Sequence, residues 1–124
     1  MAKYIILGLG GFLGALSRYV VSDWAAQKWG PAFPYGTLII NLAGSFILGF
    51  FLAASTERIP VDPRLRLFLA TGFLGAFTTF STFTYESAEL MMNGGRWLGI
   101  FNLAASVLLG ACMAFGGIWL GKQL

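Results

Sequence analysis

Long apolar stretches dominate the chain, and each stretch ends in a short group of proline, glycine or charged residues. The four longest stretches cover residues 4–21, 36–54, 65–90 and 97–120. A helix needs about 20 apolar residues to cross a hydrocarbon core of roughly 30 Å. The pattern therefore predicts an all-α integral membrane protein, in which residues 1–124 form a single domain of four transmembrane helices.

The expected connections between these spans are short and carry turn-forming residues. The first contains Asp23, Lys28, Pro31 and Pro34, the second contains Glu57, Arg58, Pro60, Asp62 and Pro63, and the third is Asn93, Gly94 and Gly95. Clusters of this kind mark turns. None of the connections is long enough to contain a soluble catalytic domain.

Composition agrees with a membrane location and excludes several kinds of chemistry. The mean hydropathy is +0.76 and only 10% of the residues are charged, against about 25% in soluble domains. Histidine is absent and Cys112 is the only cysteine, which excludes a disulfide framework, histidine acid–base catalysis and the commonest zinc ligands. The basic residues occur singly near span ends, where they anchor a helix at the lipid interface. They therefore do not predict nucleic-acid binding.

The distribution of basic residues leaves the orientation in the membrane open. One side carries five of them and the other side carries three: Lys3, Arg58, Arg64, Arg66 and Lys122 against Arg18, Lys28 and Arg96. Orientation follows the asymmetry of such residues, and this asymmetry is small. Either both termini are cytoplasmic, or the chain inserts in both directions and pairs with an antiparallel copy.

The third span combines aromatic and hydroxyl residues in an unusual way. On a regular helix Phe73, Phe77, Phe80 and Phe83 share one sector, whereas Thr71, Thr78, Ser81, Thr82 and Tyr85 lie roughly opposite. The hydroxyl face favours a polar pathway over simple hydrogen bonding between helices. Gly72, Gly75 and the adjacent threonines also weaken helix propensity. We therefore expect this helix to be broken near its middle, where freed carbonyl groups are good cation ligands.

Other polar residues in the spans have two readings each. Asn41 and Ser45 lie one turn apart in the second span, and Ser106 lies in the fourth; each either lines a pathway or forms a hydrogen bond between helices. For Arg18 and Glu86, near span ends, a structural contact is expected, and for Gly14 close helix packing. Neutral donors and positively polarised ring edges suit a small anion better than a cation.

Three motifs together resemble the Fluc (CrcB) family of fluoride channels over essentially the whole chain. They are Gly11-x-x-Gly14-Ala15-x-x-Arg18-Tyr19, Gly36-Thr37-x-x-x-Asn41-x-x-Gly44-Ser45 and Gly72-Phe73-x-Gly75-x-x-Thr78-Thr79-Phe80-Ser81-Thr82-Phe83. The resemblance implies an antiparallel, dual-topology homodimer that lets fluoride leave the cell passively through the cytoplasmic (inner) membrane.

The resemblance also implies roles for individual residues. The fluoride pathway would be formed by Asn41, Phe80, Ser81, Thr82, Phe83 and Ser106. A structural sodium ion at the dimer interface would be held by the main-chain carbonyls of Gly75 and Thr78 from each subunit. The implied partners are a second copy of the chain, fluoride and the lipid bilayer, and neither a nucleic acid nor an enzymatic activity is implied.

Three other classes of membrane protein are less consistent with the sequence. A small multidrug-resistance-type, proton-coupled transporter needs a membrane-embedded carboxylate, and residues 4–21 contain none. An intramembrane protease of the serine–histidine or metal type needs histidine. A purely structural subunit would leave the hydroxyl residues of the third span unexplained.

Overall fold

The computed structural model describes all residues 1–124 and is entirely helical. Four helical stretches are long and apolar enough to cross a membrane. The first, second and fourth are the single helices α1 (Ala2–Trp29), α2 (Tyr35–Glu57) and α6 (Arg96–Gln123). The third runs over Pro63–Met92 and is composite: α3 (Pro63–Arg66), the π-helical segment η1 (Leu67–Leu74), α4 (Gly75–Phe77) and α5 (Phe80–Met92). The chain is therefore a multi-pass membrane protein.

The first helix is longer than its apolar stretch, which corrects the expected first connection. Asp23 and Lys28 lie inside α1, and the Asp23 carboxylate accepts a hydrogen bond from Gln27 Nε2 at 2.7 Å. Residues 22–29 contain neither proline nor glycine, so nothing ends the helix there. It stops at Gly30, whose φ of 78° is open to glycine at little cost, directly before Pro31.

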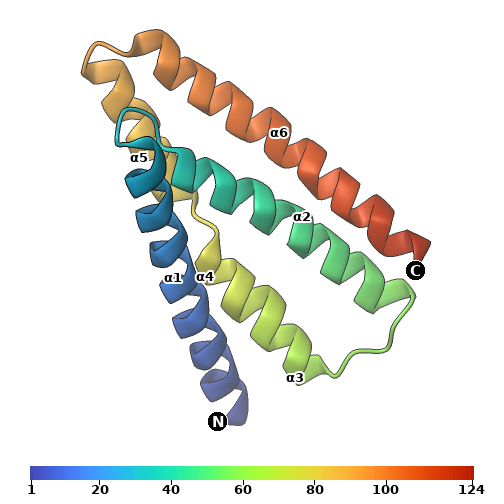
Figure 1. Ribbon diagram of the computed structural model, residues 1–124. Coiled ribbons are helices and arrows are strands. Elements are labelled where there is room, and N and C mark those ends of the chain that lie inside the picture. The colour runs from blue at the N-terminus through green and yellow to red at the C-terminus, as the bar shows by residue number, and fades with distance from the viewer.

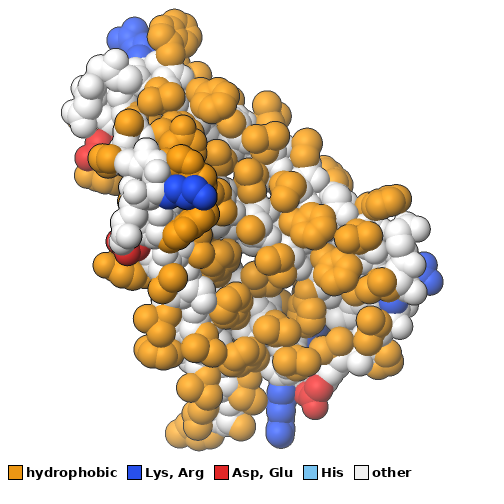
Figure 2. Space-filling model, in the orientation of Figure 1, with side chains coloured by type: hydrophobic (Ala, Val, Ile, Leu, Met, Phe, Trp, Pro, Cys, Tyr) orange, Lys and Arg blue, Asp and Glu red, His pale blue; other side chains and the backbone are white.

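The helices pack in two groups (Figure 1). Helix α1 lies beside the η1 and α4 part of the third span, and α2 lies along α6, which also contacts α5. Apolar side chains cover the face shown in Figure 2, and charged side chains gather toward its ends. Large apolar residues such as Phe12, Phe115 and Trp119 point outward. A surface of this kind suits lipid or a second membrane-embedded chain.

Close approach of α1 to the third span depends on small residues. Gly14 is buried, and a Cβ atom at this position would overlap the backbone carbonyl of Phe73. Gly10, one turn earlier, faces the backbone of Phe68 in the same way. Any larger side chain at Gly14 must separate the two helices.

The third span leaves helical geometry for two residues. Thr78 and Thr79 have extended backbones, with ψ values of 157° and 124°, and α5 begins at Phe80. The Thr79 side chain caps α5, because its Oγ1 atom accepts a hydrogen bond from the Thr82 backbone N–H at 3.2 Å. As a result, α4 and α5 are joined by a short non-helical link, visible in Figure 1.

Candidate functional site

A cavity of about 320 Å³ lies where α2, α6 and the Thr78–Thr79 link meet. Its lining is uncharged and combines amide, hydroxyl, aromatic and small residues: Asn41, Ser45, Thr78, Thr79, Phe80, Phe83, Ser106, Val107, Gly110 and Ala111. Four of the six residues expected on the fluoride pathway, Asn41, Phe80, Phe83 and Ser106, are thus brought together within one subunit. We call this space the polar cavity.

Ser81 and Thr82, the other two expected pathway residues, do not line the polar cavity. Both are exposed on the outside of the subunit. Successive residues on a helix are rotated by 100°. Because Phe80 and Phe83 face the cavity, the two residues between them face away from it. The Thr82 hydroxyl lies 3.1 Å from that of Thr79, within the cap of α5.

The two aromatic residues at the cavity differ in their exposure. The Phe80 and Phe83 rings meet edge to face, with centroids 5.9 Å apart and an interplanar angle of 67°. Phe83 is 5% exposed, whereas Phe80 is 76% exposed and projects from the subunit. Phe73 and Phe77 instead stack on each other beside the small core of Ile40 and Leu74. The aromatic stripe seen in the sequence is therefore divided by the Thr78–Thr79 link into a packing pair and a cavity pair.

Asn41 holds the backbone of Thr79 through both halves of its amide. Its Nδ2 atom donates to the Thr79 carbonyl and its Oδ1 atom accepts from the Thr79 N–H, both at 2.9 Å. An extended residue has no helical partner for either group, and Asn41 supplies both. Because Nδ2 carries two hydrogens, one N–H remains for another ligand.

The link also removes the helical donors of the Gly75 and Thr78 carbonyl groups. In a continuous helix the Gly75 carbonyl would accept from the Thr79 N–H, and the Thr78 carbonyl from the Thr82 N–H. Here these N–H groups donate to Asn41 Oδ1 and to Thr79 Oγ1 instead. No other hydrogen bond of the subunit reaches either carbonyl outside regular helix. Hard cations prefer such oxygen ligands, so this backbone fits the sodium ion that the resemblance implies.

A buried relay of hydrogen bonds connects the polar cavity to the interior of the α5–α6 contact. The Ser106 hydroxyl donates to Asn102 Oδ1 at 3.4 Å, and Asn102 Nδ2 donates to Ser87 Oγ at 2.8 Å. The Ser87 hydroxyl donates to the Phe83 carbonyl at 2.8 Å. Sequence reasoning missed Asn102 and Ser87. The signal available was the spacing of Asn102 and Ser106, which puts two polar residues one turn apart in an otherwise apolar span.

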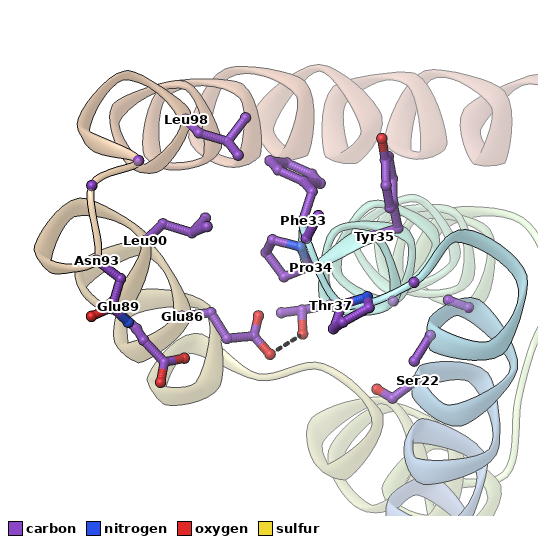
Figure 3. A pocket seen from close by; sticks show the side chains of 18 residues that line it. Ser22, Phe33, Pro34, Tyr35, Thr37, Glu86, Glu89, Leu90, Asn93 and Leu98 are labelled. Carbon is purple, nitrogen blue, oxygen red and sulfur yellow. Dashed lines mark hydrogen bonds between the residues drawn. The ribbon is translucent and has the colours of Figure 1, made fainter.

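A second, larger cavity of about 740 Å³ lies near the span ends, between α1, α2, α5 and the start of α6. In Figure 3 the Glu86 carboxylate points to Thr37, whose hydroxyl donates to Glu86 Oε1 at 3.0 Å. The other carboxylate oxygen, Oε2, is buried and has no hydrogen-bond partner. Arg18, also expected to make a structural contact, forms neither a hydrogen bond nor an ion pair within the subunit. Neither Glu86 nor Arg18 lines the polar cavity.

Comparison with known proteins gives a consistent result over the full length. The family model described as "CrcB-like protein, Camphor Resistance (CrcB)" matches residues 5–118. The chain is 42% identical over 124 residues to the fluoride-specific ion channel FluC of Sulfurihydrogenibium sp., covering 100% of both proteins. It is 45% identical to FluC of Dehalococcoides mccartyi, covering 95% of that protein, and 45% identical to FluC of Legionella pneumophila, covering 92%.

Proposed function

The chain belongs to the CrcB family, and we propose on this basis that it is a fluoride-specific ion channel that lets fluoride leave the cell passively across the cytoplasmic membrane. The observation that carries the proposal is the polar cavity. Asn41, Phe80, Phe83 and Ser106 line it together, although they come from three different spans. A channel of this kind is not an enzyme, and the roles of these residues are in binding rather than in catalysis.

The lining of the polar cavity supports an anion and a passive mechanism. It contains hydroxyl and amide groups and ring edges, all of which present positive partial charge to an anion. It contains no carboxylate that could take up and release protons. Glu86, the one acidic candidate in the third span that is partly buried, is hydrogen-bonded to Thr37 in the other cavity. A proton-coupled transporter is therefore poorly supported.

Ion efflux from liposomes that contain the purified protein tests this proposal. Fluoride should leave the vesicles at a rate that depends on protein, and chloride should be retained under the same gradient. The rate should not change when a proton gradient is imposed in either direction. Equal release of fluoride and chloride, or release only with a proton gradient, would contradict the proposed channel.

The proposal includes an antiparallel, dual-topology homodimer as the active form. Two features of the single subunit support it. Phe80, Ser81 and Thr82 are exposed beside the polar cavity, so a second copy can complete a pathway that one subunit leaves open. The near balance of basic residues between the two sides also gives little reason for one orientation.

Labelling of single cysteines tests the dual topology. A cysteine at Thr56 or Val61, in a variant whose native Cys112 is replaced by alanine, should react with an impermeant reagent in intact cells to about half of the extent reached after lysis. The expectation of about half follows from the weak charge bias, which does not favour either orientation. Labelling that is complete, or absent, in intact cells would show a single orientation and overturn this part of the proposal.

The proposal also assigns a structural sodium ion to the dimer interface. The Gly75 and Thr78 carbonyls of one subunit supply two oxygen ligands, and the same pair from an antiparallel copy would supply two more. Gly75 is exposed on the single subunit, so a second copy can approach it. The ion would satisfy carbonyls that otherwise have no partner in the membrane.

Replacing sodium by a large organic cation throughout purification should destabilise the dimer. We expect more monomer in a detergent dilution series and a lower fluoride flux, and readdition of sodium should restore both. Potassium serves as the control, because its larger radius fits a site made for sodium less well. A dimer that is equally stable when purified entirely without sodium would contradict the structural ion.

A further inference from the structure

The direction of the buried relay behind the polar cavity is fixed by its inner end. The Phe83 carbonyl can only accept a hydrogen bond, so the Ser87 hydroxyl must donate to it. The Ser87 oxygen must then accept from Asn102 Nδ2, which turns Asn102 Oδ1 toward Ser106. The orientation of an amide is otherwise ambiguous, but here the backbone determines it. The Ser106 hydroxyl is consequently the donor to Asn102.

This direction matters because Ser106 lies on the wall of the polar cavity. An anion in the cavity needs the hydroxyl proton, and in the relay that proton is directed to Asn102. When the hydroxyl turns to an anion, Asn102 Oδ1 loses its donor. Asn102 is 1% exposed and Ser87 is 0% exposed, so water cannot replace the lost bond, and a buried acceptor without a partner is unfavourable.

We propose that Asn102 is a positioning residue for the anion pathway: its side-chain oxygen competes with the anion for the Ser106 hydroxyl and so limits how tightly the cavity holds the ion. The Ser106–Asn102 distance of 3.4 Å is long for a hydroxyl donor, so this hydrogen bond is weak enough for an anion to turn the hydroxyl away from Asn102, although the exchange still costs the buried oxygen its donor. Conduction requires binding that is favourable but weak. This inference depends on the proposed function of the protein as a fluoride channel.

Asn102→Leu tests the inference, because leucine has nearly the same shape but cannot accept the proton. With the Ser106 hydroxyl freed, the fluoride concentration at half-maximal flux should fall by about threefold to tenfold, the range set by one neutral hydrogen bond. The maximal flux should fall as well, because the ion leaves more slowly. Both are measured in liposomes over a series of fluoride concentrations.

Double variants distinguish positioning from simple packing. In a Ser106→Ala background, Asn102→Leu should no longer change the half-saturating concentration. In a Ser45→Ala background, which removes another cavity hydroxyl without touching the relay, its effect should persist unchanged. An equal effect of Asn102→Leu in both backgrounds would mean that Asn102 acts only by joining α5 to α6, and would overturn the inference.

Two controls keep the outcome decisive. Asn102→Ala, which also lacks the acceptor but has less bulk, replaces Asn102→Leu in the same series if the leucine variant does not form dimers. The unmodified protein is measured alongside. If the unmodified protein carries no fluoride, the proposed function fails. If it carries fluoride normally and Asn102→Leu has the same effect in both backgrounds, only the proposed role of Asn102 is refuted.

Discussion

Replacing Phe83 or Phe80 with isoleucine should remove most of the fluoride flux while the protein still folds and forms dimers. Both rings line the polar cavity, and their hydrogen-bearing edges carry positive partial charge, which isoleucine lacks. Loss of an interaction with a charged group costs about 1.5–3 kcal/mol. Since each 1.36 kcal/mol changes a rate about tenfold, the flux should fall by roughly one to two orders of magnitude.

Phe73→Ile is the matched control for these variants. Phe73 is also in the third span and also contacts a second phenylalanine, but it stacks on Phe77 away from the cavity. Its replacement should lower stability modestly and leave flux nearly unchanged. Fluoride efflux, detergent stability and the dimer fraction are measured for all three variants. Normal flux through well-folded Phe80→Ile and Phe83→Ile channels would show that the two rings contribute to packing and not to permeation.

The two phenylalanines also test the proposed dimer. Phe83 is buried within its own subunit, whereas Phe80 is 76% exposed. In an antiparallel dimer the exposed ring would be placed against the partner. Phe80→Ile should therefore affect both flux and dimer stability more than its contacts within one subunit suggest. Phe83→Ile should lower flux and, because Phe83 is buried, the stability of its own subunit, without a separate effect on the dimer.

The four spans could be predicted because a membrane imposes a strong constraint on hydrophobic length. Every predicted span lies within an observed helical stretch. The ends were less predictable, as α1 shows: its polar last turns, with Asp23 and Lys28, read as a connection, although only Gly30 and Pro31 can end the helix. Polar residues along a chain indicate where a helix leaves the hydrocarbon core, but they do not indicate where the helix ends.

The candidate site was predictable in its residue types but not in its geometry. The sequence indicated weak helix propensity around Gly75 and Thr78, and the extended residues of the structure lie just there, at Thr78 and Thr79. A helical wheel nevertheless assumed one regular helix, so it placed Phe80 and Phe83 opposite the hydroxyl groups. The polar side of the cavity comes instead from the Thr78–Thr79 link and from Asn41, Ser45 and Ser106 on other helices, and no pattern within one span contains that information.

The contacts of Asn41 likewise could not be predicted from the sequence. The sequence offered it as a hydrogen-bond donor for an anion or for another helix. In the structure it is bound to both backbone groups of Thr79, and this contact keeps the Thr79 N–H away from the Gly75 carbonyl. Asn41 therefore supports the non-helical link, and with its remaining N–H it can also face the cavity.

Asn41→Asp should abolish fluoride flux almost completely. The carboxylate keeps an acceptor for the Thr79 N–H but loses the donor to the Thr79 carbonyl, and it places a negative charge on the wall of an anion pathway. Two unit charges about 4 Å apart repel by about 4 kcal/mol at an effective dielectric constant of 20. At about tenfold per 1.36 kcal/mol, the flux should fall at least about a hundredfold in liposome efflux.

Asn41→Leu distinguishes the effect of an added negative charge from the effect of losing the hydrogen bonds to the Thr79 backbone. Leucine adds no charge but removes both hydrogen bonds to Thr79, so the Thr79 N–H can return to the Gly75 carbonyl as in a regular helix. We expect it to lower flux and to weaken the proposed dependence of the dimer on sodium, because one carbonyl of the proposed sodium site is lost. Ser45→Ala, one turn along α2 on the same cavity, should leave the sodium dependence intact. If Asn41→Leu keeps normal flux and normal sodium dependence, then Asn41 does not maintain the link, and only the added charge explains the loss in Asn41→Asp.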